Sequence, residues 1–331
     1  MLRFSQTQID AVANMRRSHE NQHTAMNSAM GGQLLIGNAS PLPRDVWGEW
    51  DKESVQLQRT ILAVFNDLAA SVARPMNIGK LMHYFRTVSD SGEINISLDG
   101  RSKAKADQPV VDYHGTPLPI IDSTFGFGWR EMAAAQTEND SLEGDGRLNS
   151  LRKVAEKLEN IALFGDANIK IGSDTLFGLT NHPMRGTRTT GVTLNGATGA
   201  QWQTEVKATL AVLHAMNFRE NATLYVNWDD WFYAGTTDEV TTYKGLTIAQ
   251  KITQMAGVGS VVPSSSVTAG TIIAVVKRRE VLQVLNGMPI TTRAQFRANP
   301  EDDYNFIVMA AASLEIKYDA NDNCGVAHSS L

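Results

Sequence analysis

The strongest hydrophobic pattern in the chain lies between residues 147 and 164. Apolar side chains return there every three or four positions, which places them on one face of an amphipathic helix. Asp145 stands where an N-cap would be, and Gly165 stands where a glycine would end the helix. We therefore predict a long helix over residues 147–164. The side chains expected to face the core are Leu148, Leu151, Val154, Leu158 and Ile161.

Similar spacing predicts helices in several other segments. A helix over residues 45–70 would end at or shortly before Pro75, because a proline ring is incompatible with a helix interior. In another predicted helix, 229–234, the carboxylates Asp229 and Asp230 would stand at the start, where the helix dipole favours negative charge. The remaining predicted helices span residues 8–17, 200–217 and 248–255.

Alternating apolar residues and runs of β-branched residues predict strands. Between Met82 and Ala134 the texture is extended, and this includes the segment Arg130–Met132. Two strands, 83–90 and 93–100, would flank a turn at Ser91 and Gly92. Further strands are predicted over residues 222–227, 271–278 and 306–319, whereas the glycine-punctuated segment 165–183 predicts tight turns without a regular element.

The extended region contains a charged segment, residues 101–108, that has no large apolar side chain. We predict a long hairpin with this segment at its tip. Arms of roughly ten residues would reach on the order of 35 Å, and a two-stranded ribbon of that kind is only marginally stable without a partner. The tip residues expected to meet a neighbouring molecule are Arg101, Lys103 and Lys105. These cations would keep an exposed tip soluble; covalent crosslinking of a tip lysine is the alternative.

Composition and charge limit the classes of function. Of the 331 residues, 42% are hydrophobic and 20% are charged, as in a globular protein with a core. The formal net charge is -5, so any contact with nucleic acid is expected to be weak and non-specific. The single cysteine, Cys324, forms no intrachain disulfide, which fits a protein made in a cytoplasm. The longest apolar runs, 271–276 and 306–312, are too short to span a membrane, and we expect no membrane contact and no signal peptide.

No motif predicts a catalytic residue, a cofactor or a metal. His19 and His23 stand at the i, i+4 spacing of a helical zinc motif, with Glu20 between them. Because matches to short motifs are common by chance, we predict no metal there. Residues 301–303 are three consecutive acidic residues. Glycosidase-type acid/base catalysis needs two carboxylates opposed across a cleft, which neighbours in the sequence do not supply. A metal-dependent hydrolase that uses the two histidines and a distant acid is the enzymatic alternative.

Several stretches resemble those of tailed-bacteriophage major capsid proteins and the related encapsulin nanocompartments. The closest is AEKLENIALFGDANIKIGSDTLFGLTNHP (155–183), a long helix followed by a Gly-Leu-Thr-Asn turn. The hairpin at 82–119 stands where that family has its extended loop. The other similar stretches are LPRDVWGEWDKESVQLQR (42–59), TFGFGWREMAAA (124–135), LNGMPITTRAQF (285–296) and FIVMAAASLEIKYDANDNCGVAH (306–328).

The resemblance implies the α+β Hong Kong 97-type capsid fold and a shell protein without enzymatic activity. Subunits would assemble in the host cytoplasm, as pentamers and hexamers, into the icosahedral capsid of a virion that encloses a phage dsDNA genome. Scaffold, portal and decoration proteins would be further partners. An encapsulin-type compartment that encloses a cargo enzyme is the alternative with the same fold. The implied parts are an N-terminal arm (1–45), a helical segment (46–81), an extended loop (82–119), a peripheral domain (120–197 and 285–331) that holds the spine helix 147–164, and an axial domain (198–284).

Overall fold

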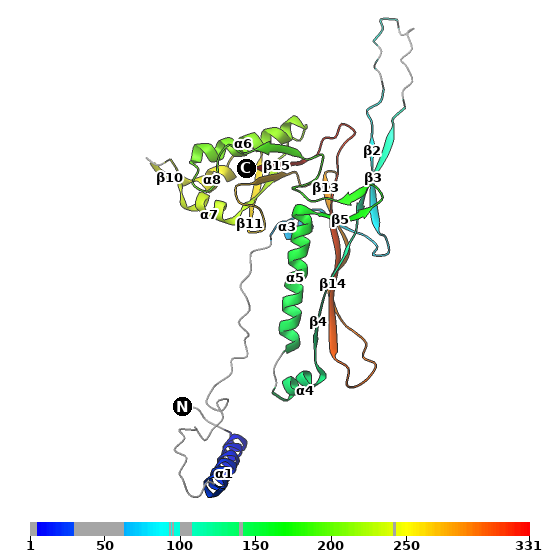
Figure 1. Cartoon of the computed structure of the whole chain (residues 1–331). Coiled ribbons are helices and arrows are strands. Elements are labelled where there is room, and N and C mark those ends of the chain that lie inside the picture. Colours follow the sequence, from blue (N-terminus) through cyan, green and yellow to red (C-terminus); the bar gives the residue numbers. More distant parts are fainter. Residues whose placement is uncertain are drawn as a thin grey trace. The chain divides into compact units, whose positions relative to one another are not determined.

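The computed structural model describes residues 5–29, 63–92, 94, 96–99, 108–138, 142–240 and 243–331. The chain divides into two compact units, Met1–Leu57 and Gln58–Leu331. In the first unit, α1 is a single helix over Gln6–Ala29 (Figure 1), which confirms and lengthens the helix predicted over 8–17. None of the side chains described in α1 is buried. Within the described residues this helix therefore gains little stability from tertiary packing.

The second unit contains a four-stranded sheet with the strand order β1-β13-β14-β4. Neighbouring strands are antiparallel, except that β1 runs parallel to β13. A long helix, α5, lies along β4 and β14 (Figure 1), and α3 packs against β13 and α5. These elements are β1 (Ala73–Pro75), β13 (Leu282–Ala294), β14 (Tyr304–Ile316), β4 (Ile120–Phe127), α3 (Val64–Val72) and α5 (Leu142–Phe164).

The predicted long helix is confirmed as α5, although its start differs from the prediction. α5 begins at Leu142, so Asp145 lies inside the helix and is not its N-cap. Gly165 follows the last helical residue with a φ of 65°, a left-handed conformation that glycine adopts readily. The predicted C-terminal stop is therefore confirmed, and the predicted N-cap is wrong.

Most of the predicted apolar face of α5 is turned toward the sheet. Its residues Val154, Leu158 and Ile161 are buried, and Leu151 is half-buried. Val154 and Leu158 pack against the β14 side chains Val308, Ala310 and Ala312. Leu148, by contrast, is 43% exposed, so its predicted place in the core is wrong. The apolar period of α5 therefore extends along the sequence to Leu148, which the sheet does not cover.

The second unit also contains a five-stranded mixed sheet with the strand order β11-β8-β12-β15-β7. The helices α6, α7 and α8 pack on it, and Trp202 of α6 and Tyr225 of β8 are fully buried in its core. The predicted helices 200–217, 229–234 and 248–255 are confirmed as α6, α7 and α8, and two predicted strands as β8 and β12. These elements are β11 (Val258–Ser264), β8 (Ala222–Asn227), β12 (Ile272–Val275), β15 (Val326–Ser330), β7 (Gly186–Thr189), α6 (Gly199–Ala215), α7 (Trp228–Thr236) and α8 (Ile248–Thr253).

The C-terminal strand does not follow the predicted division of the chain. The range 285–331 was expected to belong to one domain with residues 120–197. Instead, β15 pairs antiparallel with β12 of the range 198–284 and parallel with β7 of the range 120–197, so the five-stranded sheet combines strands of both predicted domains. The short polar sequence VAHSS has no pattern that reveals this pairing, because the partner strands are distant in sequence.

The predicted hairpin is present, but its second strand differs from the prediction. β2 (Met82–Val88) pairs antiparallel with β3 (Val111–Pro117). The segment 93–100 is not the partner strand, because its described residues, 94 and 96–99, belong to no strand. The predicted tip residues Arg101, Lys103 and Lys105 lie outside the described residues.

Two other segments differ from the sequence expectation. Arg130–Met132 lies in the helix α4 (Trp129–Glu138), because Gly128 ends the strand and the following Met-Ala-Ala-Ala run has high helix propensity. The segment 165–183 contains a small hairpin, β5 (Asp166–Ile171) and β6 (Asp174–Leu176), whose strands are too short to show a clear alternation. The remaining pair is β9 (Asp238–Val240) and β10 (Tyr243–Thr247).

Candidate functional site

A row of exposed apolar side chains follows β2 in the connection toward β3. Ile94 and Ile96 are each 91% exposed, and Leu98 is 110% exposed. On the return side, Val110 is 70% exposed. Burial of one such side chain stabilises a protein by about 1.5–3 kcal/mol. A segment that leaves three large aliphatic side chains in water is therefore well suited to be covered by another molecule.

The two faces of the β2–β3 hairpin differ in exposure. One face carries Phe85 and Thr87 toward the rest of the unit, and these residues are half-buried and buried. The opposite face is exposed and rich in tyrosine, with Tyr113 at 65% and Tyr84 at 58% exposure. Tyrosine and arginine are enriched in protein interfaces, so the outer face has the composition of a contact surface. The residues of this outer face are Tyr84, Arg86, Val88, Val111 and Tyr113.

A buried carboxylate holds the root of the hairpin. Glu315 of β14 is fully buried, and its Oε2 lies 2.6 Å from Nδ1 of His83 on β2. Its Oε1 accepts a hydrogen bond from Nε2 of Gln283 at 2.6 Å. Burial lowers the pKa of nearby Lys317, against the opposite effect of Glu315. Because a buried carboxylate is stable only when its oxygens are satisfied, these contacts fix the root of β2 to the four-stranded sheet.

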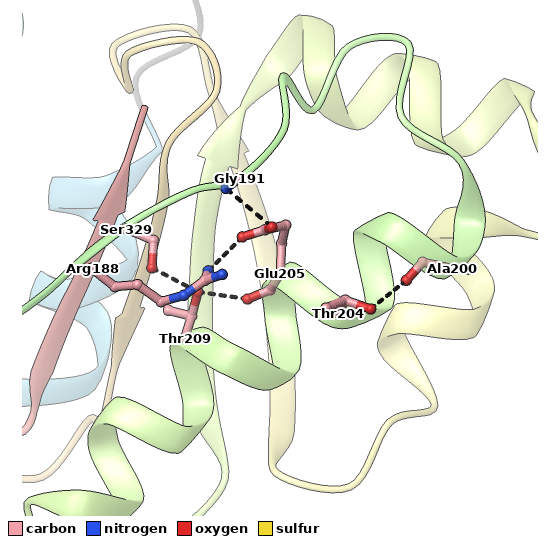
Figure 2. Close-up of polar contacts among 7 residues, drawn as sticks. All are labelled: Arg188, Gly191, Ala200, Thr204, Glu205, Thr209 and Ser329. Carbon is pink, nitrogen blue, oxygen red and sulfur yellow. Dashed lines mark hydrogen bonds and ion pairs between the residues drawn. The ribbon is translucent and has the colours of Figure 1, made fainter.

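A second buried carboxylate fastens α6 to the edge of the five-stranded sheet (Figure 2). Glu205 forms an ion pair with Arg188 of β7 and accepts a hydrogen bond from the backbone N–H of Gly191 at 3.2 Å. One turn further along, Thr209 donates to the backbone carbonyl of Glu205, and its hydroxyl lies 2.8 Å from that of Ser329 on β15. The polar groups satisfy one another within the fold, so this cluster is structural.

A third buried carboxylate joins three elements. Glu159 of α5 accepts hydrogen bonds from the backbone N–H groups of Val64 at 3.0 Å and Phe65 at 2.7 Å, at the start of α3. The hydroxyl of Ser264 on β11 donates to the same carboxylate at 3.1 Å. Negative charge is favourable at a helix N-terminus, so Glu159 caps α3 and ties it to α5 and β11.

In the described part of the chain, the potentially reactive side chains have structural roles. Cys324 is fully buried, and burial raises the pKa of its thiol to about 12, so it is protonated at neutral pH. Asp229 and Asp230 stand in the first turn of α7, as predicted. Asp230 accepts a hydrogen bond from the backbone N–H of Gly270 at 2.7 Å, and burial raises its pKa.

The histidine pair of the first unit lies on α1. Residues 19–23 read His-Glu-Asn-Gln-His, and the helix continues through them, so His19 and His23 are one turn apart. His19 is half-buried, and the side chain of His23 lies outside the described residues. A zinc site needs at least three protein ligands. In the described part of the chain, no three His, Cys, Asp or Glu side chains are grouped to hold a metal ion.

A cluster of rings at the hairpin root has no counterpart in the sequence predictions. Phe85, His114, His182 and Tyr318 come together there from four separate segments. These segments are far apart in the sequence and meet only in the folded chain, so the spacing of residues in the sequence does not predict the cluster.

Among the described residues, no helix is long and apolar enough to cross a membrane.

The arrangement of sheets, long helix and hairpin is similar to that of solved capsids. The capsid of Myoviridae Phage XM1 matches with a TM-score of 0.69 at 11% identity, over 87% of this chain and 98% of that chain. The capsid of a native GTA particle matches with a TM-score of 0.59 at 12% identity, over 88% and 99%. A virus-like particle from Pyrococcus furiosus matches with a TM-score of 0.52 at 13% identity, over 80% and 94%. The chain therefore has the Hong Kong 97-type capsid fold, which confirms the fold predicted from the sequence.

The sequence itself places the chain in one family. Residues 38–329 match a family of unknown function (DUF6260), and the chain belongs to that family. A comparison with curated protein sequences finds no match.

Proposed function

We propose that this chain is the major capsid protein of a tailed bacteriophage, and that its copies self-assemble into an icosahedral shell around a dsDNA genome. The observation that carries the proposal is the row Ile94, Ile96 and Leu98, left almost completely in water on a capsid-type subunit. In a shell, a neighbouring subunit would cover these side chains. Many modest contacts of this kind, repeated around a closed particle, give stability through avidity.

The proposal assigns roles to parts of the chain. The arm 1–45 and the loop 82–119, with Arg101, Lys103 and Lys105 at its tip, would contact sister subunits. Residues 198–284 would form the axial domain at the centres of pentamers and hexamers. Residues 120–197 and 285–331 would form the peripheral domain around the spine helix, apart from β7 and β15, which pair in the five-stranded sheet.

Further partners follow from the same proposal. Scaffold, portal and decoration proteins would act during assembly in the host cytoplasm, and the virion capsid would be the final location. The net charge of -5 supports a wall that touches packaged DNA only weakly and non-specifically. No reaction is assigned to the chain.

The test is a variant that removes the apolar row. The triple substitution Ile94→Ser, Ile96→Ser and Leu98→Ser should leave the circular dichroism spectrum and Tm of the subunit unchanged, because these side chains contribute nothing to its own core. Particle formation, measured by mass photometry, should fall at least tenfold, since three buried aliphatic contacts per subunit are lost.

The matched control changes polar positions on the same hairpin. Asp90→Asn with Ser91→Thr alters two exposed residues and should leave assembly as in the wild type. Assembly of the triple variant at the wild-type level would contradict the proposed role of the row. The contents of the particles, DNA or a protein cargo, separate a virus head from an encapsulin-type compartment.

A further inference from the structure

A pocket of about 160 Å³ lies at the root of the hairpin, where three parts of the second unit meet. The β2–β3 hairpin contributes Phe85 and His114, the strand β6 contributes Asp174, and the main body contributes His182 and Tyr318. No single element forms the pocket, so any ligand in it would touch the hairpin and the body at the same time.

The wall of the pocket is a continuous series of rings. His114 and Tyr318 have ring centroids 4.8 Å apart, and Phe85 meets Tyr318 edge-on at 5.7 Å. His182 extends the series, with its ring 5.7 Å from that of Tyr318 and 5.6 Å from that of Phe177. A cation is attracted to the electron-rich face of an aromatic ring, and the Phe85 and Tyr318 rings that line the pocket can each offer one.

Negative charge lies on the Tyr318 side of the pocket. The pKa of the Tyr318 phenol is raised, first by burial and then by the charges of Asp322, Asp112 and Asp174. His182 brings no compensating positive charge, because burial and then the charge of Arg185 lower its pKa to about 4. Arg185 itself donates a hydrogen bond to the backbone carbonyl of His182 at 2.8 Å and is not part of the pocket lining.

Gly115 allows the carboxylate of Asp174 to come close to β3. A Cβ at position 115 would lie 2.6 Å from Oδ2 of Asp174 and 2.9 Å from a ring carbon of Tyr84. A real Cβ does not make contacts this short, so a larger residue at position 115 would require the side chains of Met82, Asp174 and Tyr84 to shift. Aromatic rings together with a carboxylate are the arrangement that binds alkylammonium and guanidinium groups.

We propose that this root pocket, lined by Phe85, His114, Asp174, His182 and Tyr318, binds one alkylammonium or guanidinium group. The group comes either from a free polyamine or from a lysine or arginine side chain of a sister subunit. Its binding links the β2–β3 hairpin to the body of the subunit. The inference does not depend on the proposed function, because the pocket belongs to a single chain and would bind such a cation even if no shell formed.

The experiment titrates agmatine and n-butylammonium into the unassembled full-length chain, with 1-butanol as the neutral probe. Isothermal titration calorimetry should show binding of both cations and none of the alcohol. Asp174→Asn and Tyr318→Leu should each weaken the affinity for agmatine about tenfold while the circular dichroism spectrum stays unchanged. Asp303→Asn removes one exposed carboxylate outside the pocket and should leave the affinity unchanged, which controls for net charge.

The assembled particles distinguish the two sources of the cation. Agmatine binding by particles as well as by subunits identifies a free polyamine as the ligand. Binding by subunits alone identifies a sister side chain that already fills the pocket in the particle. Absence of binding by the subunit, equal binding of 1-butanol, or wild-type affinity in both pocket variants would overturn the proposal.

Discussion

At the scale of single residues, three buried carboxylates connect elements that are far apart in sequence. Glu159 reaches α3 and β11, Glu205 reaches β7, and Glu315 reaches the hairpin root. Each accepts hydrogen bonds from groups that would otherwise be left without a partner in the interior. Loss of such a carboxylate leaves its partners unsatisfied, at a cost of about 1–3 kcal/mol for each uncharged one.

A buried histidine makes stability depend on pH. His182 is 5% exposed, and burial, with the charge of Arg185, lowers its pKa from 6.5 to about 4. Its Nδ1 accepts a hydrogen bond from the backbone N–H of Met184 at 3.2 Å, which requires that nitrogen to be unprotonated. At a pH between these two values, His182 is protonated in the unfolded chain and unprotonated in the folded chain. Stability is therefore complete above about pH 6.5 and is lost as the pH falls toward 4.

The substitution His182→Gln tests this dependence in the unassembled subunit. From pH 7 to pH 4, the free energy of unfolding in urea should fall by about 3 kcal/mol more in the wild type than in the variant. Other titrating groups affect both proteins equally, so the difference between the two curves isolates His182. Parallel curves would show that this histidine does not couple folding to pH.

At the scale of elements, strong local periodicity predicts what the chain forms. The helix α5 was predictable because its residues are amphipathic over many turns. The strand β8 was predictable because it is a short run of residues that are all buried. β15 and the β5–β6 hairpin were missed because short strands are defined by their partners. The partner of β2 was placed at 93–100 since alternation predicts an extended chain and does not select the strand that it pairs with. The root pocket was missed for the same reason, because its rings come from separate segments.

A comparison of two glycines with nearly the same φ distinguishes the effect of backbone strain from that of steric crowding. Gly165 and Gly172 have φ values of 65° and 64°. A Cβ at Gly172 would meet nothing within 4 Å, whereas at Gly165 it would meet the backbone of Leu176 and of Gly178. Gly172→Ala should therefore lower the free energy of unfolding by about 1–2 kcal/mol from the left-handed conformation alone. Gly165→Ala should cost clearly more, because the end of α5 must also move. Equal losses in a urea titration would contradict the close packing at Gly165.

At the scale of the whole molecule, the described surface of the hairpin has the features expected of a contact surface. The hairpin places apolar side chains in water and a tyrosine-rich face opposite its attached side, while its root is fixed by buried contacts. A hairpin that is firmly attached at its root and exposes large apolar side chains gains stability when another molecule covers them. Under the proposed function, sister subunits would satisfy this requirement repeatedly and symmetrically.

Electron microscopy of the purified full-length chain tests this requirement most directly. We expect closed icosahedral particles of megadalton mass, with the β2–β3 hairpin of each subunit lying on a neighbour. A chain that stays monomeric or dimeric under all assembly conditions, with the hairpin in solvent, would contradict it.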